Sequence, residues 1–183
     1  MMGNRGILHD DARRIVRPFA ARRWIACTLA FRGRHRTVMA PHRYTELFFL
    51  DEATAFAAGH RPCAECRRDD YRRFQALWNA CNLGPTNADA MDARLHQERL
   101  AGKEKRTYRE RSKNLPDGAY AVLDGAAWLL WEDALLAWSD AGYARRRPRP
   151  LRDEVEVLTP RSLVAILLAG YRPGIHASVR GLS

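Results

Sequence analysis

The stretch that decides the fold is Gly59-His60-Arg61-Pro62-Cys63-Ala64-Glu65-Cys66-Arg67. Its first four residues are typical of a helix end, because glycine accepts the left-handed conformation there and proline cannot continue a helix. Its last five place two cysteines, Cys63 and Cys66, at the start of a further helical pattern. A helix N-terminus lowers the pKa of such thiols, and two thiolates at this spacing reach one ion. The stretch therefore predicts a metal site, with zinc as the metal.

Helical patterns stand on both sides of the cysteine pair. Asp51 can cap a short helix over residues 52–58, which would end at Gly59. From residue 63 to residue 81 apolar side chains recur at helical spacing, which predicts a helix of about four turns. After a Gly-Pro break, a third helix is expected from residue 86 or 87 to about residue 101.

Upstream of these helices, the pattern predicts a β-hairpin. Residues 24–31 are rich in residues that favour strands, a glycine turn follows, and residues 37–39 lead back. Cys27 lies in the middle of the first expected strand.

Two thiolates do not complete a tetrahedral zinc site, so further ligands are needed. Cys81 stands 18 residues after Cys63, about 25 Å away along a continuous helix, and is expected to be a core thiol. Cys27 is the expected third ligand. The candidates for the fourth ligand are His9 or His42, and after them His60. A redox dithiol is the alternative, although no βαβ unit precedes the pair.

Residues 46–67 resemble the second half of the metal-binding domain of the bacterial Ada family of DNA-alkylation-repair proteins. That family has a short aromatic strand, an Ala-rich helix and then Ala-Gly-aromatic-Arg-Pro-Cys-x-x-Cys-Arg, which residues 58–67 match. The resemblance implies a structural zinc bound by Cys63 and Cys66, in a small α/β domain that contacts DNA phosphates. A further cysteine pair of the family, one member of which accepts methyl groups, has only Cys27 in its place here.

The charge of the chain favours a polyanionic partner. The formal net charge is +10 with a pI of about 10.1, and the first 43 residues hold ten arginines against two aspartates. Such an excess attracts nucleic acid, with DNA favoured over RNA, although a merely solvated basic surface is the alternative. The residues expected to contact nucleic acid are Arg22, Arg23, Arg34, Arg36, Arg43 and Arg67.

Catalysis stays open at the level of sequence. Outside the cysteines, the polar constellation dense enough for a nuclease is His96, Glu98 and Arg106. The Pro-Cys-x-x-Cys stretch also fits half of a zinc nucleobase deaminase, but the His-x-Glu that this chemistry needs upstream is absent. A third hypothesis, a protein-interaction adaptor, would require an exposed apolar patch in the C-terminal part.

The whole pattern predicts an α+β fold with two lobes. A zinc-containing basic domain over 1–102, built from a zinc-stabilised β-hairpin and helices, precedes a loop or linker over 103–114. A second small α+β lobe over 115–183 packs on the first. Its expected elements are strands over 119–123, 127–130 and 154–158, a turn at Asp124-Gly125, a helix over 132–138, a basic loop over 145–149 and a helix from Pro160 to Gly170.

The compartment expected from these features is the cytoplasm. The first ten residues form no apolar core of a secretory signal, and no apolar run approaches the ~20 residues that span a bilayer. Four cysteines in such a chain are interpreted as thiols or metal ligands, and not as disulfides.

Overall fold

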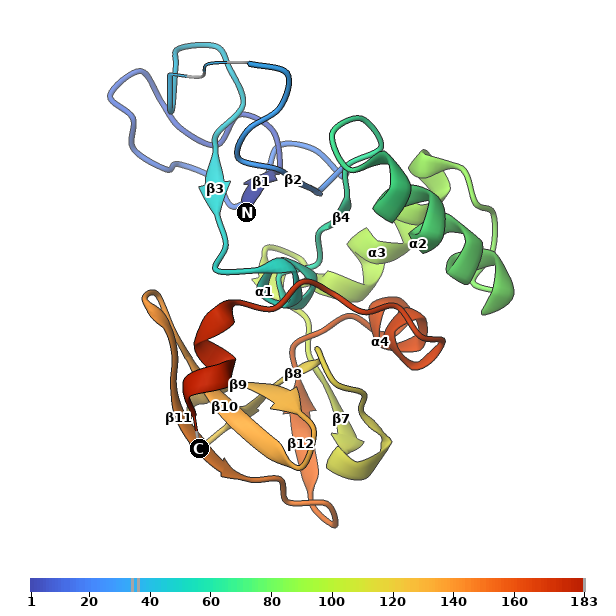
Figure 1. Cartoon of the computed structure of the whole chain (residues 1–183). Coiled ribbons are helices and arrows are strands. Elements are labelled where there is room, and N and C mark those ends of the chain that lie inside the picture. The colour runs from blue at the N-terminus through green and yellow to red at the C-terminus, as the bar shows by residue number, and fades with distance from the viewer. Residues whose placement is uncertain (34, 36, 183) are drawn as a thin grey trace.

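The fold is α+β, and the computed structural model describes residues 1–33, 35 and 37–182. Figure 1 shows a small sheet with long loops at one end of the molecule, helices in the middle and a larger sheet at the other end. Arg34 and Arg36, two of the expected nucleic-acid contacts, lie outside the described residues.

The small sheet has the strand order β3-β1-β2-β4. Its strands are short: β1 is Met2–Asn4, β2 is Ile25–Cys27, β3 is Leu47–Phe48 and β4 is Arg61–Pro62. β1 pairs antiparallel with β2 and β3, whereas β2 and β4 run parallel. The predicted hairpin is therefore wrong. Residues 24–31 supply a strand, but it pairs with β1 and β4, while residues 38 and 39 form a turn.

The three helices around the cysteine pair are confirmed. Helix α1 (Glu52–Ala57) begins at Asp51, whose carboxylate accepts a hydrogen bond from the Thr54 N–H, and Gly59 follows it with a φ of +84°. Helix α2 spans Arg68–Ala80, so the cysteine pair lies in the turn just before it. Helix α3 spans Ala88–Arg99 and is capped by Asn87.

The larger sheet has six strands in the order β11-β10-β9-β8-β12-β7. Strands β8 (Tyr120–Leu123) and β9 (Ala126–Trp131) form the hairpin that was predicted around Asp124 and Gly125. Both turn residues have positive φ, 52° and 74°, as a two-residue hairpin turn of this type requires. Strand β12 (Glu154–Val157) confirms the predicted third strand, and it lies between β8 and β7.

Three expectations for the C-terminal part are wrong. The segment 103–114, expected to be a loop or linker, contains β6 (Glu104–Lys105), which pairs with β5 (Leu100–Ala101). It also contains β7 (Tyr108–Arg111), which pairs with β12, and the 3₁₀ turn η1 (Ser112–Asn114).

The predicted helix over 132–138 is strand β10 (Ala134–Ser139), and the predicted basic loop lies in strand β11 (Gly142–Pro148). Pairing of β10 with β9 on one side and β11 on the other outweighs the weak local preference for a helix.

The chain ends in α4 (Arg161–Leu168) and the 3₁₀ turn η2 (Ala177–Gly181). Pro160 precedes the first turn of α4 and Gly170 follows the helix with a φ of +100°, as the sequence predicts.

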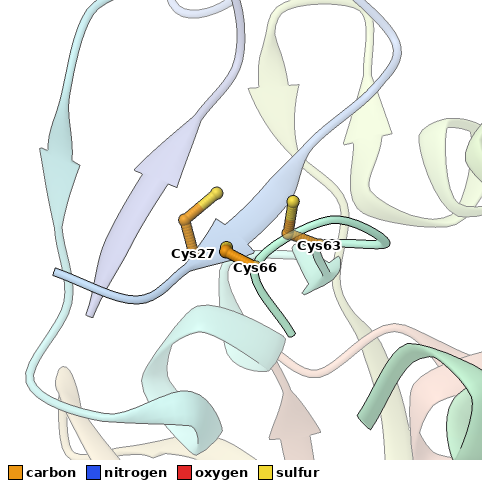
Figure 2. Close-up of side chains that lie close together, drawn as sticks. All are labelled: Cys27, Cys63 and Cys66. Atoms are coloured by element: carbon orange, nitrogen blue, oxygen red, sulfur yellow. The ribbon is translucent and has the colours of Figure 1, made fainter. Parts of the chain in front are cut away.

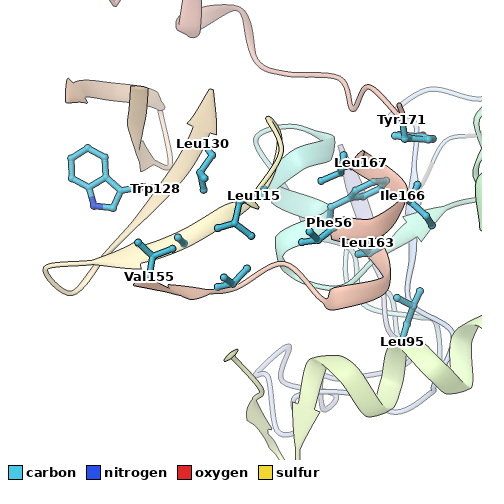
Figure 3. Packing of buried hydrophobic residues seen from close by; sticks show 14 of the residues in the cluster. Phe56, Leu95, Leu115, Trp128, Leu130, Val155, Leu163, Ile166, Leu167 and Tyr171 are labelled. Atoms are coloured by element: carbon cyan, nitrogen blue, oxygen red, sulfur yellow. The ribbon is translucent and has the colours of Figure 1, made fainter. Parts of the chain in front are cut away.

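The main core joins the helices to the larger sheet (Figure 3). Phe56 of α1, Leu95 of α3 and Leu163 of α4 belong to one buried cluster with Trp128 and Val155 of the sheet. The two lobes expected from sequence therefore share a core. Strand β4 of the small sheet contacts α2, whose Phe74 and Trp78 belong to that core. None of the helices in the described part of the chain combines the length and apolar character that a bilayer crossing requires.

Candidate metal centre

Three cysteine sulfurs come together where the small sheet meets α2. The Sγ atoms of Cys27, Cys63 and Cys66 all lie within 4.8 Å of one another, and Figure 2 shows the three side chains converging from strand β2 and from the turn before α2. A tetrahedral ion with Zn–S bonds of about 2.3 Å separates its ligand sulfurs by about 3.8 Å. The three thiols therefore fit a single metal ion.

The parallel pairing of β2 with β4 explains why Cys27 meets Cys63. Ile25 pairs with Arg61 and Ala26 with Pro62, so the next pair in register is Cys27 with Cys63. The Cys63 N–H continues the ladder by donating to the Ala26 carbonyl oxygen at 3.1 Å. The sequence named Cys27 as the expected third ligand, and the structure places it beside Cys63 and Cys66, although the hairpin to which it was assigned does not form.

The turn between the two later cysteines is also ordered by hydrogen bonds. The Arg67 N–H donates to the Cys63 carbonyl oxygen at 3.1 Å, which closes one turn and brings Cys66 back beside Cys63. The Glu65 N–H donates to the Cys63 sulfur at 3.5 Å. Backbone N–H groups that point at a sulfur stabilise its thiolate, the form that binds a metal.

The pKa values of Cys27 and Cys63 shift in opposite directions. A hydrogen bond from the Cys27 thiol lowers the pKa of Cys63, and the N–H groups of Cys66 and Glu65 act in the same direction against burial. The same hydrogen bond, together with burial, raises the pKa of Cys27. Cys27 and Cys63 are each 7% exposed, whereas Cys66 is half-buried. Cys63 therefore favours the thiolate form that binds a metal. A bound cation would take the place of the Cys27 proton that lies between the two sulfurs.

The fourth ligand expected from sequence is not beside the cysteines. No histidine, aspartate or glutamate of the described residues joins the three sulfurs within the same distance. His9 is buried in the loop after β1, where its Nδ1 lies 2.6 Å from the Thr45 hydroxyl. His42 is exposed in the loop before β3. His60 is buried between Phe49 and Trp24, with ring centroids at 4.7 and 5.3 Å, and Arg5 donates to its Nε2.

Cys81 lies outside the cysteine group, as its distance from Cys63 predicts, but it is half-buried and so is not the core thiol that was expected. It caps the end of α2, and its thiol donates to the Ala165 carbonyl oxygen of α4 at 3.7 Å. It is not one of the three grouped cysteines.

The arginines expected to contact nucleic acid divide into exposed and buried ones. Arg22, Arg23 and Arg43 are exposed, and Arg23 forms an ion pair with Asp89 at 2.9 Å. Arg67 is only 9% exposed, and its guanidinium contacts Glu52 at 2.8 Å and Asp70 at 2.6 Å. Its donors are used inside the protein, so this geometry corrects the expectation that Arg67 contacts a phosphate.

The three residues considered for catalysis have separate structural partners. The His96 ring packs edge-on against Phe19, and its Nδ1 lies 3.2 Å from an Arg99 nitrogen. Glu98 accepts hydrogen bonds from the Ser162 N–H and hydroxyl at the start of α4. Arg106 donates to the Leu100 carbonyl oxygen. Since residues two apart on a helix do not face each other, His96 and Glu98 form no common site.

Buried arginines near the metal centre were missed at the level of sequence. Arg61, directly before Pro62, is 2% exposed and pairs with Asp92 of α3. The guanidinium carbons of Arg5 and Arg99 each lie 3.9 Å from the Trp24 ring centroid, within the range of a cation–π contact. Arg61 carries a sequence signal in the Arg-Pro-Cys order, but its partner is 31 residues away and no local pattern indicates it.

Comparisons of the chain with protein-family models, with curated proteins and with solved structures found no match.

Proposed function

We propose that this protein is a zinc protein that binds nucleic acid, with the zinc held by Cys27, Cys63 and Cys66. The observation that carries the proposal is the convergence of three sulfurs within 4.8 Å of one another. Three thiolates are soft ligands, and among the common ions of proteins they favour zinc over magnesium or calcium.

In this fold the zinc would stabilise the lobe that contains the small sheet. The strands of the small sheet are two or three residues long, and among the described residues the apolar cluster around the cysteines has only Met2, Cys27 and Cys63 as buried members. So little burial stabilises a lobe weakly. A metal that ties β2 to the turn before α2 supplies the missing free energy, as metals do in other small domains.

The nucleic-acid part of the proposal rests on charge and its placement. The net charge is +10, and the loops that leave the small sheet carry exposed arginines: Arg13, Arg14, Arg17, Arg22, Arg23 and Arg43. Figure 1 shows these loops extending from the small sheet, away from the larger sheet. The resemblance of residues 46–67 to the Ada metal-binding domain supports DNA as the nucleic acid, in a context of repair or modification.

Binding of labelled duplex DNA, followed by fluorescence anisotropy over a range of salt concentrations, tests this part. We expect affinity to fall steeply with salt, since each neutralised phosphate releases counterions. The double variant Arg22→Gln with Arg43→Gln should make the slope of log K against log salt shallower by about 1.8, because each lost contact removes about 0.9.

The matched control removes the same charge from the other end of the molecule. Lys113 follows β7 and Arg152 precedes β12, and both are exposed. The double variant Lys113→Gln with Arg152→Gln should keep the wild-type slope. Equal losses in the two double variants would mean that net charge alone attracts the DNA, and the proposed binding surface would be rejected.

A further inference from the structure

We propose that the metal centre binds an exogenous thiol that carries an anionic group. The thiol sulfur would complete the tetrahedron around the metal, and the anionic group would lie in the adjoining cavity toward Arg22. The inference rests on the proposed zinc site and adds to it a ligand class that the cysteines alone do not specify.

The first argument is the ligand count and what faces the sulfurs. Three protein sulfurs form the group, and within the described residues no histidine or carboxylate joins it. A cavity of about 150 Å³ lies against the three cysteines, and its lining also includes Met2, Phe31, Tyr44 and Glu65. Structural zinc sites are closed by four protein ligands, whereas sites that bind ligands keep one position open. A metal held here would face space large enough for a ligand atom.

The second argument is a larger cavity beside the first. It has a volume of about 670 Å³, which lies within the ordinary range for small-molecule sites. Asn4, Ile25 and Tyr44 line both cavities, so the larger one adjoins the metal centre through these three residues. A ligand atom on the metal could therefore belong to a molecule that extends past Tyr44.

The metal with its three thiolates, and the arginines of the larger cavity, indicate which chemical class of ligand would bind. Three thiolates form a soft ligand set, and a fourth sulfur donor completes the four-sulfur set that is common at zinc, whereas a hard oxygen anion is a poorer match. On binding, the thiol would lose its proton to solvent, its sulfur lone pair would form the metal–sulfur bond, and the water that otherwise holds the fourth position would leave to solvent.

Two arginines, Arg22 and Arg23, take part in the lining of the larger cavity. Arg23 is engaged by Asp89 at 2.9 Å and lies 3.9 Å from Asp92. Arg22 also lines the cavity, is exposed, and has no ion pair among the residues that the structure describes. Its guanidinium is therefore the cation available for a carboxylate or a similar group on the ligand.

Cobalt-substituted full-length protein provides the test, because each sulfur bound to cobalt(II) adds to a sulfur-to-cobalt charge-transfer band. Titrants would be mercaptoacetate, 3-mercaptopropionate and 6-mercaptohexanoate, with propionate, imidazole and 2-mercaptoethanol as comparisons. We expect the thiols to raise the charge-transfer band at constant cobalt content, and propionate and imidazole to leave it unchanged. One mercaptocarboxylate length should bind more tightly than 2-mercaptoethanol, because it spans the metal and Arg22.

Substitutions test the contribution of Arg22 and that of the metal ligands independently. Arg22→Gln should weaken the best mercaptocarboxylate about 5-fold and leave 2-mercaptoethanol unaffected, since an exposed ion pair contributes up to about 1 kcal/mol. Arg17→Gln removes an exposed arginine that does not line the cavity, and it should change neither affinity. Glu65→Gln should leave the cobalt spectrum without titrant unchanged; a changed spectrum would make Glu65 a protein ligand and overturn the inference.

The failures of the two proposals are distinguishable. If cobalt and zinc do not bind, the metal site itself is wrong. If cobalt binds with three sulfurs but no thiol alters its spectrum, or if Arg22→Gln weakens no mercaptocarboxylate, the zinc proposal stands and the thiol site is rejected.

Discussion

Arg61 binds Asp92 through two parallel hydrogen bonds, Nε to Oδ1 at 2.9 Å and Nη2 to Oδ2 at 2.6 Å, with both side chains only 2% exposed. Arg61 lies in β4, two residues before Cys63, and Asp92 lies in α3. The pair therefore joins the segment that leads into Cys63, one of the three candidate metal ligands, to a helix of the main core. The planar guanidinium matches the carboxylate in a way that a lysine would not.

Asp92→Ala should lower the free energy of unfolding by about 3–5 kcal/mol, because it leaves a buried guanidinium without its partner. Urea denaturation of the zinc-loaded protein would measure the loss. The control is Asp89→Ala, which breaks an ion pair whose carboxylate is 85% exposed and should cost less than about 1 kcal/mol. Similar losses in both variants would show that the buried pair has no special role.

Arg67→Ala should destabilise the fold by about 3 kcal/mol and leave DNA affinity unchanged, because Arg67 neutralises the buried Glu52 and lies away from solvent. Its neighbour Arg68 is exposed, and Arg68→Ala should change stability by less than about 0.5 kcal/mol. Denaturation and DNA-binding curves on both variants would check this. A loss of DNA affinity in folded Arg67→Ala protein would restore Arg67 as a nucleic-acid contact.

Gly59→Ala should cost more stability than Gly170→Ala, although both glycines follow a helix with positive φ, +84° and +100°. A Cβ at residue 59 would lie 2.6 Å from the Arg99 Cδ, whereas a Cβ at residue 170 would meet nothing within 4 Å. Both variants suffer the backbone strain of about 1 kcal/mol, and only the first adds a clash. Thermal unfolding would compare them, and equal losses would contradict the close packing of Arg99.

His60→Phe should make stability less dependent on pH below about 6.5. Burial, with Arg5 and Arg99 adding to it, lowers the pKa of His60 well below its usual value, so the ring is neutral in the folded protein. Below about pH 6.5 His60 is protonated in the unfolded chain but stays neutral in the folded protein. The free energy of unfolding therefore falls, by up to about 1.4 kcal/mol for each pH unit, as the pH decreases.

Chemical denaturation of wild type, His60→Phe and His60→Gln between pH 5 and 7 would test this effect. Both variants should show the same shallower slope, because neither side chain titrates there. Parallel pH profiles in all three proteins would show that His60 is protonated in the folded state.

The parts of the fold that were predictable depend on local chemistry. The cap at Asp51, the Asp124-Gly125 turn and the Pro160 start of α4 each involve residues within a few positions of one another. Strand β10 was missed, since its apolar residues fit a helix until β9 and β11 pair with it. Glu132, with a φ of 53°, turns the chain into this strand, and no residue type there signals that turn.

The candidate site was predictable in its ligand types and less so in its surroundings. Cys27 could be chosen because the chain has four cysteines and Cys81 lies too far from Cys63 along a continuous helix. His9 was a reasonable fourth ligand by type, but its ring packs beside Thr45, a contact between loops 36 residues apart. The burial of Arg61, Arg67 and Arg99 could not be predicted either. The carboxylate and carbonyl groups that pair with Arg61 and Arg99 are distant in sequence and come close only in the folded chain.

The most direct test of the metal centre is the zinc content of purified protein, prepared without chelator, for the wild type and the four single cysteine-to-alanine variants. The account predicts one zinc per chain in wild type and in Cys81→Ala, and loss of zinc in Cys27→Ala, Cys63→Ala and Cys66→Ala. Wild-type protein without zinc, or Cys27→Ala protein that keeps it fully, would contradict the three-cysteine site.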